Sequence, residues 1–405
     1  MPVNSELRAS WVATVDNLDW PSKASSQILN TSERVTAQKA ELLRIVDEAV
    51  KMGMSDIIFH VGPCADAFYR SSFLPWSSYL TGSLGKDPGF DPLGFAVEAA
   101  HAKGLKLHAW LNPYRVSMDT KQETINSLEN SDPNSHESIY KRHKDWIGIA
   151  YDRFVLNPGI PEVRAWVKDR VTEIVKNYSV DAIHFDDYFY YESKASYLDD
   201  DETYKKYRCN FDNKVDWRRN NTYLLITEVS EAIKSIKSNV QFGISPAGVW
   251  RNKKFDLKDP AKIDPNGSDT EVQVTNFDGS YADTRQWVLK EKIDYIVPQI
   301  YWTFEREIAR YNVIAQWWAN TVKGTHVKLY IGMALYKVGI PSTVEPDWTF
   351  EDGVPEIKRQ LDLNNSTPQI QGSILFRHLS LRKPQAQSVA RYIREQWSQP
   401  MESTN

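Results

Sequence analysis

A chain of 405 residues with a formal net charge of −4 is long enough for one large barrel or for two or three smaller domains. The acidic balance argues against nucleic acid as a partner, because such binding needs clustered Lys and Arg. No stretch approaches the roughly 18 uncharged apolar residues of a membrane span, and the start of the chain shows no apolar signal-peptide region.

The aromatic content is the unusual feature of the composition, with 14 Trp, 20 Tyr and 15 Phe. Large barrels bury some of these rings as core. Sugar-binding clefts expose them, because a pyranose presents C–H groups to an aromatic face. The two cysteines, Cys64 and Cys209, form neither a disulfide framework nor a CxxC metal motif, and they do not identify the compartment.

Short β-rich runs alternate with amphipathic helical runs along the whole chain. The runs that we predict as strands cover residues 8–15, 56–61, 106–115, 181–187, 241–249, 294–302, 328–336 and 372–380. The helical period is clearest after the third of them, where Val163, Val167 and Val171 fall on one face with charges opposite. Gly53 and Gly104 stand where helix C-terminal caps are expected.

Eight strand–helix units in strand-first order predict a closed parallel sheet, the (β/α)8 TIM barrel. A doubly wound open sheet is the alternative, but no GxGxxG motif follows any strand. We expect residues 1–397 to form a single barrel and residues 398–405 to be a loose tail. The residues in excess of an ordinary barrel follow strands, over 62–90, 116–160, 188–216 and 250–282. They therefore predict long loops on the C-terminal face, which is the catalytic face of this fold.

The fourth predicted strand ends in two adjacent acids, Asp186 and Asp187, within DAIHFDDYFYY. Isolated buried carboxylates are costly, so two of them at a strand end usually have a function, with a simple strand-end cap as the alternative. Period-two alternation places His184 on the same side of the strand as Asp186.

Other polar and aromatic residues close the remaining strands and are expected to bind substrate at the same face. With His184 and Tyr188 beside the acids, they are His60, Asn112, Tyr114, Arg115, Trp250, Arg251, Gln299, Tyr301, Trp302 and Arg377. Each has a plainer explanation on its own: His60 and His184 as satisfied core histidines, and Arg377 as the partner of a structural acid. Together they indicate an enzyme cleft.

Three reaction classes use adjacent aspartates or a strand-end nucleophile. The eight histidines show no HxxxH or HExxH spacing, so we expect no metal and no cofactor. A serine nucleophile would need a GxSxG elbow, which is absent. Glycoside hydrolysis needs two carboxyl groups and aromatic platforms, and the strand ends provide both.

The predicted mechanism follows from the spacing of the acids. No Glu or Asp ends the fifth, sixth or seventh strand, and adjacent Cα atoms lie only about 3.8 Å apart. Such a pair suits substrate-assisted cleavage of an N-acetylated sugar, with Asp187 as acid/base and Asp186 orienting the acetamido group, or the reverse. Tyr301 is expected to hydrogen-bond the acetamido carbonyl. If Asp187 points away, Glu192 or Glu305 is the partner.

A series of ordered motifs gives the chain a family resemblance from Leu7 to Trp397. They are ASWVATVDNLDWP, FLPWSSYLTG, LHAWLNPYRVS, DRFVLNPGIPEV, HFDDYFY, VDWRRNN, FGISPAGVWRN, SYADTRQWV, DYIVPQIYW, LYIGMALYKVG and GSILFR. With these motifs the chain resembles the bacterial glycosyl-hydrolase-like family ten. HFDDYFY is the acidic motif of that family and coincides with the site argued above.

The resemblance implies a barrel in the cell envelope that hydrolyses peptidoglycan glycan strands lacking stem peptides, left by amidases at the division site. It also implies a periplasmic location, with membrane contact only through the lipid anchor of an outer-membrane lipoprotein precursor. A non-catalytic glycan-binding barrel and a hydrolase of another N-acetylated bacterial glycan are the alternatives. Arg115, Arg251 and Arg377 are candidates to bind the lactyl carboxylate of muramic acid, and the 116–160 loop is a candidate to exclude stem peptides sterically.

Overall fold

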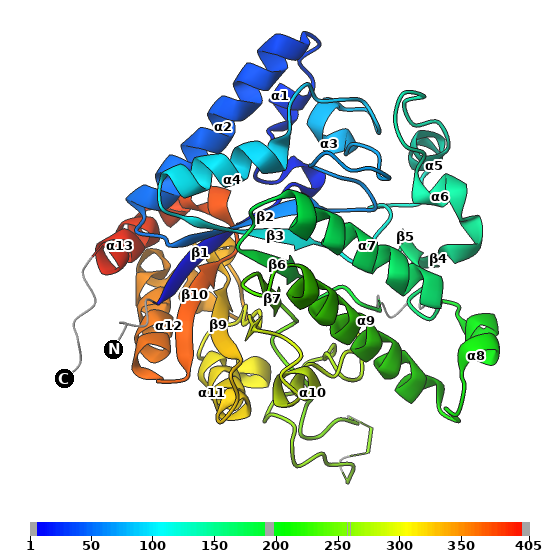
Figure 1. Ribbon diagram of the computed structural model, residues 1–405. Helices are drawn as coiled ribbons and strands as arrows, with labels where there is room; N and C mark the ends of the chain where they lie inside the picture. The colour runs from blue at the N-terminus through cyan, green and yellow to red at the C-terminus, as the bar shows by residue number, and fades with distance from the viewer. Residues whose placement is uncertain (1–5, 191–197, 257, 260, 399–405) are drawn as a thin grey trace.

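The computed structural model describes residues 6–190, 198–256, 258–259 and 261–398, and shows a barrel of strands ringed by helices (Figure 1). Glu192 and all of the predicted C-terminal tail except Ser398 lie outside the described residues. None of the helices in the described ranges combines the length and apolar character that spanning a bilayer requires.

The parallel strands of the described chain close into a barrel in the order β1-β10-β9-β8-β7-β6-β3-β2, which confirms the predicted (β/α)8 fold. The strands are β1 (Leu7–Val12), β2 (Asp56–Gly62), β3 (Lys106–Leu111), β6 (Ala182–Phe185), β7 (Gln241–Ile244), β8 (Tyr295–Ile296), β9 (Lys328–Met333) and β10 (Ile370–Leu375). The first and last strands pair directly, with Ser10 opposite Leu375, so the two ends of the chain complete the barrel.

Several strands end earlier than their sequence patterns predicted. β3 ends at Leu111, β7 at Ile244 and β8 at Ile296, whereas the apolar runs continue for several residues more. A proline follows each of these strands within two residues, at Pro113, Pro246 and Pro298. Because proline has no N–H to donate to a ladder, it releases the chain into a loop at the catalytic face.

The helices between the strands begin and end where local signals place them. The helices that complete the strand–helix units are α2 (Thr31–Lys51), α4 (Pro92–Ala102), α7 (Pro161–Asn177), α9 (Lys214–Ile236), α10 (Thr284–Leu289), α11 (Tyr311–Val322), α12 (Val354–Ser366) and α13 (Gln387–Trp397). The Asn30 side chain accepts from Glu33 N and caps α2, while Pro161 occupies the first turn of α7. Gly53 and Gly104 follow α2 and α4 with positive φ angles, as predicted for C-terminal caps.

The long loops predicted on the C-terminal face are present and contain structure of their own. They carry α3 (Ser78–Thr81), α5 (Gln122–Glu129), α6 (Ile139–Arg142) and α8 (Asp201–Tyr207), while α1 (Lys23–Ser26) lies between β1 and α2. The short 3-10 turns are η1 (Val15–Asn17), η2 (Lys144–Trp146), η3 (Glu307–Ala309), η4 (Leu335–Lys337), η5 (Pro346–Trp348), η6 (Phe350–Gly353), η7 (His378–Arg382) and η8 (Pro384–Ala386). A hairpin of β4 (Ile147–Ala150) and β5 (Arg153–Leu156), which the sequence did not predict, lies in the loop after β3.

Two apolar cores hold the barrel. The larger lies between the strands and the helices, and a smaller one fills the barrel interior with residues such as Trp11, Trp110 and Tyr295. Tyr295 fits there because Gly243 lies opposite: a Cβ at that position would come within 1.9 Å of the tyrosine ring. Glycine on β7 therefore makes room for a large ring on β8.

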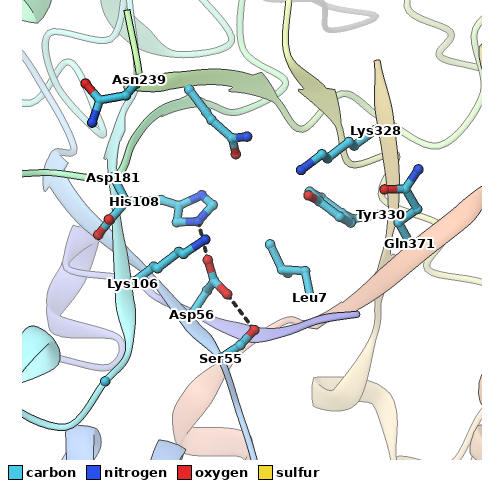
Figure 2. Close-up of a pocket in the computed structure, with 12 residues that line it drawn as sticks. Leu7, Ser55, Asp56, Lys106, His108, Asp181, Asn239, Lys328, Tyr330 and Gln371 are labelled. Carbon is cyan, nitrogen blue, oxygen red and sulfur yellow. Dashed lines mark hydrogen bonds and ion pairs between the residues drawn. The ribbon is translucent and has the colours of Figure 1, made fainter. Parts of the chain in front are cut away.

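The N-terminal end of the barrel contains a polar cavity of about 550 Å³. Figure 2 shows its lining, with Asp56 at the centre between His108 and Ser55. Polar residues at strand starts surround them, including Lys106, Asn239, Lys328 and Gln371. In this fold the N-terminal face contributes to stability and the C-terminal face to chemistry, so we expect the functional site at the opposite end.

Candidate active site

A cavity of about 380 Å³ opens at the C-terminal end of the barrel. Both aspartates of the DD pair line it, together with Arg115, Tyr188, Gln299 and Tyr301 among the residues predicted from the sequence. The remaining lining residues are Trp11, Ala13, Val15, Asp16, Leu18, Trp110, Met118, Arg153 and Phe376.

Asp186 is the more buried of the two acids, with 4% of its surface exposed. Its carboxylate accepts hydrogen bonds from Trp110 Nε1 at 3.2 Å and from Asn112 Nδ2 at 3.1 Å. Asn112 is itself fixed, because its Oδ1 accepts from the backbone N of Arg115 at 3.0 Å. Burial raises the pKa of Asp186, and the Arg115 charge and these two neutral donors offset only part of that rise.

Asp187 is half-buried beside it. Burial and then the charge of Asp186 raise the pKa of the Asp187 carboxyl to about 7, against opposing effects of a Gln299 hydrogen bond and the Arg115 charge. A carboxyl with that pKa holds its proton in a large share of molecules at neutral pH, as a general acid must. The pair therefore has the electrostatics that an acid catalyst needs.

Aromatic rings form the walls of the cleft. Tyr301 stacks on Phe376 with ring centroids 5.7 Å apart, and Arg115 lies 5.5 Å from the Tyr188 ring centre. Burial raises the pKa of the Tyr301 phenol, so its hydroxyl remains a hydrogen-bond donor. Arg115 is held by its own Nε, which donates to Pro63 O at 2.8 Å.

Trp11 forms part of the cleft and is held from below by a chain of buried polar groups. Trp11 Nε1 donates to His184 Nε2 at 3.1 Å, and His184 Nδ1 lies 3.0 Å from the Tyr295 hydroxyl. The same hydroxyl lies 2.8 Å from His108 Nδ1, and His108 Nε2 lies 2.8 Å from Asp56 Oδ1. An indole only donates and a carboxylate only accepts, so both histidines are satisfied as neutral rings with every proton directed toward Asp56.

His184 and His60 thus lie beneath the cleft rather than in it. His184 is fully buried, and burial together with His108 keeps its pKa well below the usual value. His60 is also fully buried and stacks face to face on Trp110 at 3.7 Å. Neither predicted substrate-binding histidine reaches the cavity, because each points into the barrel one layer below the strand ends.

Five other predicted binding residues are placed away from the cleft: Tyr114, Trp250, Arg251, Trp302 and Arg377. Tyr114 and Trp250 are buried against the helices, and Trp302 packs on the same core. Trp250 also stacks on Trp317 and donates to Asp283 at 2.9 Å. These rings face the helical layer and not the barrel mouth.

The two arginines of that group are engaged by acids of their own. Arg251 contacts Asp264 and Asp278, each at 2.9 Å. Arg377 contacts buried Asp19 at 2.8 Å and donates to Leu18 O, which fixes the loop that carries Leu18 to the cleft. The alternative acid Glu305 is exposed and contacts Arg359 at 3.1 Å, away from the cavity.

Several cleft residues were missed in the sequence. Trp11 and Trp110 lie within strands rather than after them, but the alternation of side chains along a strand directs both rings into the barrel. Asp16 brings a third carboxylate to the cleft from η1 and accepts from the Tyr79 hydroxyl at 3.2 Å. Arg153 comes from the unpredicted β4–β5 hairpin, so no strand-end rule pointed to it.

The fold and the site together define a TIM-barrel protein of the glycoside-hydrolase class. The model of the Glycosyl hydrolase-like 10 family matches residues 6–350, and the chain belongs to that family, as the motifs predicted. Family membership supports a glycosidase.

Two relatives show how far the similarity extends. The chain is 50% identical over 391 residues to Glycosyl hydrolase DigH of Escherichia coli strain K12, covering 96% of this chain and 87% of the relative. It is 42% identical over 380 residues to Glycosyl hydrolase YngK of Bacillus subtilis strain 168, covering 93% of this chain and 69% of that protein.

Solved structures show the same fold at low sequence identity. The catalytic domain of a β-amylase from Paenibacillus polymyxa aligns with a TM-score of 0.54 at 10% identity, covering 98% of this chain and 100% of that one. An endo-1,4-β-mannanase from Rhizomucor miehei gives 0.52 at 10% identity, covering 96% and 95%. At such identities the likeness concerns the barrel alone.

Proposed function

We propose that this protein is a glycoside hydrolase that cleaves denuded peptidoglycan glycan strands between their N-acetylated sugars. The observation that carries the proposal is the carboxyl pair: Asp187, with a pKa raised to about 7, beside the buried and hydrogen-bonded Asp186. Aromatic rings surround the pair, as sugar binding requires. The family resemblance supplies the substrate, whose two sugars both carry an acetamido group.

In the proposed mechanism the substrate provides the nucleophile. Asp187 donates its proton to the glycosidic oxygen as the bond from that oxygen to the anomeric carbon breaks. The acetamido oxygen attacks the same carbon, while Asp186 accepts the acetamido N–H and stabilises the positive charge that forms. Asp187, now ionised, takes a proton from the water that opens the cyclic intermediate.

The burial of the two acids supports this division of roles. Asp186 is held by an indole and an amide, so its carboxylate is preorganised to orient a substrate group. Asp187 is the more accessible acid and suits proton transfer to a leaving group. The Tyr301 hydroxyl, kept protonated by burial, suits a hydrogen bond to the acetamido carbonyl.

The same proposal assigns the protein to the cell envelope. The resemblance supports a periplasmic protein of cell division that is held at the outer membrane by the lipid anchor of a longer precursor.

Mass spectrometry of reaction products tests the activity. The protein is incubated with amidase-denuded glycan strands and, in parallel, with intact peptidoglycan. Fragments with hydrated reducing ends from the denuded strands alone are the expected result. Anhydro-ended or deacetylated products would contradict the mechanism. Binding without any product from either substrate would instead favour a non-catalytic glycan-binding barrel.

A further inference from the structure

The β4–β5 hairpin brings an arginine to the cleft from outside the barrel. The hairpin lies in the long loop between β3 and α7 (Figure 1), and Arg153, its first residue after the turn, lines the same cavity as Asp186 and Asp187. The exposed ring of Tyr151 supports this arginine, with the guanidinium 4.7 Å from the ring centre. The turn therefore presents an aromatic ring and a cation together at the mouth of the site.

The backbone of this turn is unfavourable for Tyr151. Tyr151 and Asp152 both have φ angles of +53°, as a two-residue hairpin turn requires. Gly, Asn and Asp adopt this conformation most readily, so Asp152 suits the turn, whereas a bulky tyrosine adopts it at a cost. Strained positions of this kind gather at ligand-binding sites, so the strain is a second indication that the turn serves a function.

The partners of Arg153 differ from those of two arginines that the sequence suggested, Arg251 and Arg377. Arg251 and Arg377 each contact protein carboxylates. Within the described ranges Arg153 has no carboxylate partner: its Nη1 donates to Tyr151 O at 3.4 Å, and its buried Nε has no partner. A half-buried guanidinium favours an acid, and its planar fork fits a carboxylate with two parallel hydrogen bonds.

The substrate of the proposed function offers such a carboxylate. The lactyl group of N-acetylmuramic acid is joined to the stem peptide through an amide, which is neutral. Amidase hydrolysis of that amide leaves a free lactyl carboxylate. A denuded strand therefore differs from a peptide-bearing strand by one negative charge on every second sugar, as well as by its smaller bulk.

We infer that Arg153, supported by Tyr151, is a subsite for the lactyl carboxylate of N-acetylmuramic acid and makes the cleft selective for denuded strands. The inference rests on the proposed function for its ligand but concerns recognition rather than cleavage. The 116–160 loop was expected to exclude stem peptides sterically. Because the hairpin in that loop carries Arg153, we infer instead that the loop recognises the charge of the denuded strand. A charge-assisted hydrogen bond pair of this kind corresponds to roughly a 10- to 100-fold preference.

Binding of two matched ligands tests the inference. One is a glycan tetrasaccharide with free lactyl carboxylates, and the other is the same tetrasaccharide with those groups converted to carboxamides. Calorimetric titration of the wild-type protein is expected to show about 10-fold or greater preference for the carboxylate form. Arg153→Gln is expected to remove the preference by weakening carboxylate binding alone, and Arg153→Lys to retain part of it, because lysine keeps the charge but not the fork.

Arg142→Gln is the matched control, since Arg142 is an exposed arginine in the same loop that does not line the cavity. It should keep the wild-type preference. Equal binding of the two ligands by wild type, no binding of either, or an equal loss of both in Arg153→Gln would overturn the inference. Because the readout is binding, a lack of glycan cleavage would count against the proposed hydrolase and leave this result interpretable.

Discussion

The two ends of the barrel each bury an aspartate to the same extent, yet their environments act in opposite directions. Asp186 and Asp56 are both 4% exposed. At the C-terminal end burial prevails, and the pKa of Asp186 is raised because its hydrogen-bond donors are a neutral indole and an amide. At the N-terminal end burial also favours the neutral form, but hydrogen bonds from His108 and Ser55 lower the pKa of Asp56 (Figure 2).

The comparison shows that the partners of an aspartate, and not its exposure or the size of the cavity beside it, decide whether its pKa is raised or lowered. The cavity around Asp56 is the larger, at about 550 Å³ against about 380 Å³. The carboxylate of Asp56 is nevertheless paired with an imidazole, whereas the described donors to the acids of the smaller cleft are neutral groups, with the charge of Arg115 nearby. Three predictions test this difference.

Exchanging acid for amide at the two ends should have the largest effect. Asp187→Asn removes the proton donor and is expected to lower kcat by about 10²- to 10⁴-fold with little loss of stability. Asp56→Asn is expected to retain most of the activity while lowering the free energy of unfolding by about 2 kcal/mol, because it weakens a buried hydrogen bond to a charged group. Product release from denuded strands and urea denaturation measure the two effects. A comparable loss of kcat in both variants would contradict the comparison.

The acids at the two ends of the barrel should also differ in their effect at changing pH, Asp187 on activity and Asp56 on stability. The proposed reaction needs protonated Asp187, so kcat/KM should fall about tenfold per pH unit above pH 7. Asp56 has a folded-state pKa below its unfolded value of about 3.9. Its contribution to stability is therefore present above that value and is lost as the pH falls through the folded-state pKa. The free energy of unfolding should therefore fall less in Asp56→Asn than in wild type as the pH is lowered from 5. An activity profile that is flat through pH 7 would exclude Asp187 as the acid.

The smallest expected effect concerns the buried chain of hydrogen bonds that joins Trp11 at one end of the barrel to Asp56 at the other. Tyr295→Phe removes the hydroxyl between His184 and His108, so Trp11 is held less firmly, and KM should rise about fivefold, equivalent to about 1 kcal/mol of coupling. Combined with Trp11→Phe, which lacks the indole N–H, Tyr295→Phe should cause no further rise in KM. A general structural defect would persist in the double variant.

Tyr330→Phe serves as the control for that cycle. Tyr330 is buried and lines the Asp56 cavity at the N-terminal end of the barrel, but its hydroxyl does not belong to the hydrogen-bond chain from Trp11 to Asp56. Its substitution should leave KM unchanged.

The barrel could be predicted from the sequence because each of its repeated strand–helix units has a local sequence pattern. Alternating apolar runs and helical periods predict each unit, and glycine caps such as Gly53 mark where the units join. The Asp186–Asp187 pair was found for a similar reason, since a strand end in this fold determines which way its side chains face.

The positions of the other predicted binding residues depend on tertiary partners that a strand-end rule does not take into account. Arg377 follows a strand, but buried Asp19, far away in the chain, binds it. Trp250 likewise follows a strand and turns toward the helices. Arg153 was missed because its turn, Tyr151–Asp152, lacks the Asn–Gly signature of a two-residue hairpin. The role assigned to each acid stays a prediction until the variants are measured.

The closing seam of the barrel has a consequence for how the protein is made. Trp11 on β1 packs against Phe376, just past β10, with ring centroids 5.8 Å apart, and both rings line the cleft. Trp11 and Phe376 belong to the first and last parts of the barrel's sequence, so both β1 and β10 must leave the ribosome before these walls meet. A nascent or truncated chain that ends before β10 has no complete cleft, and the proposed hydrolase therefore gains its activity only after β10 has been synthesised.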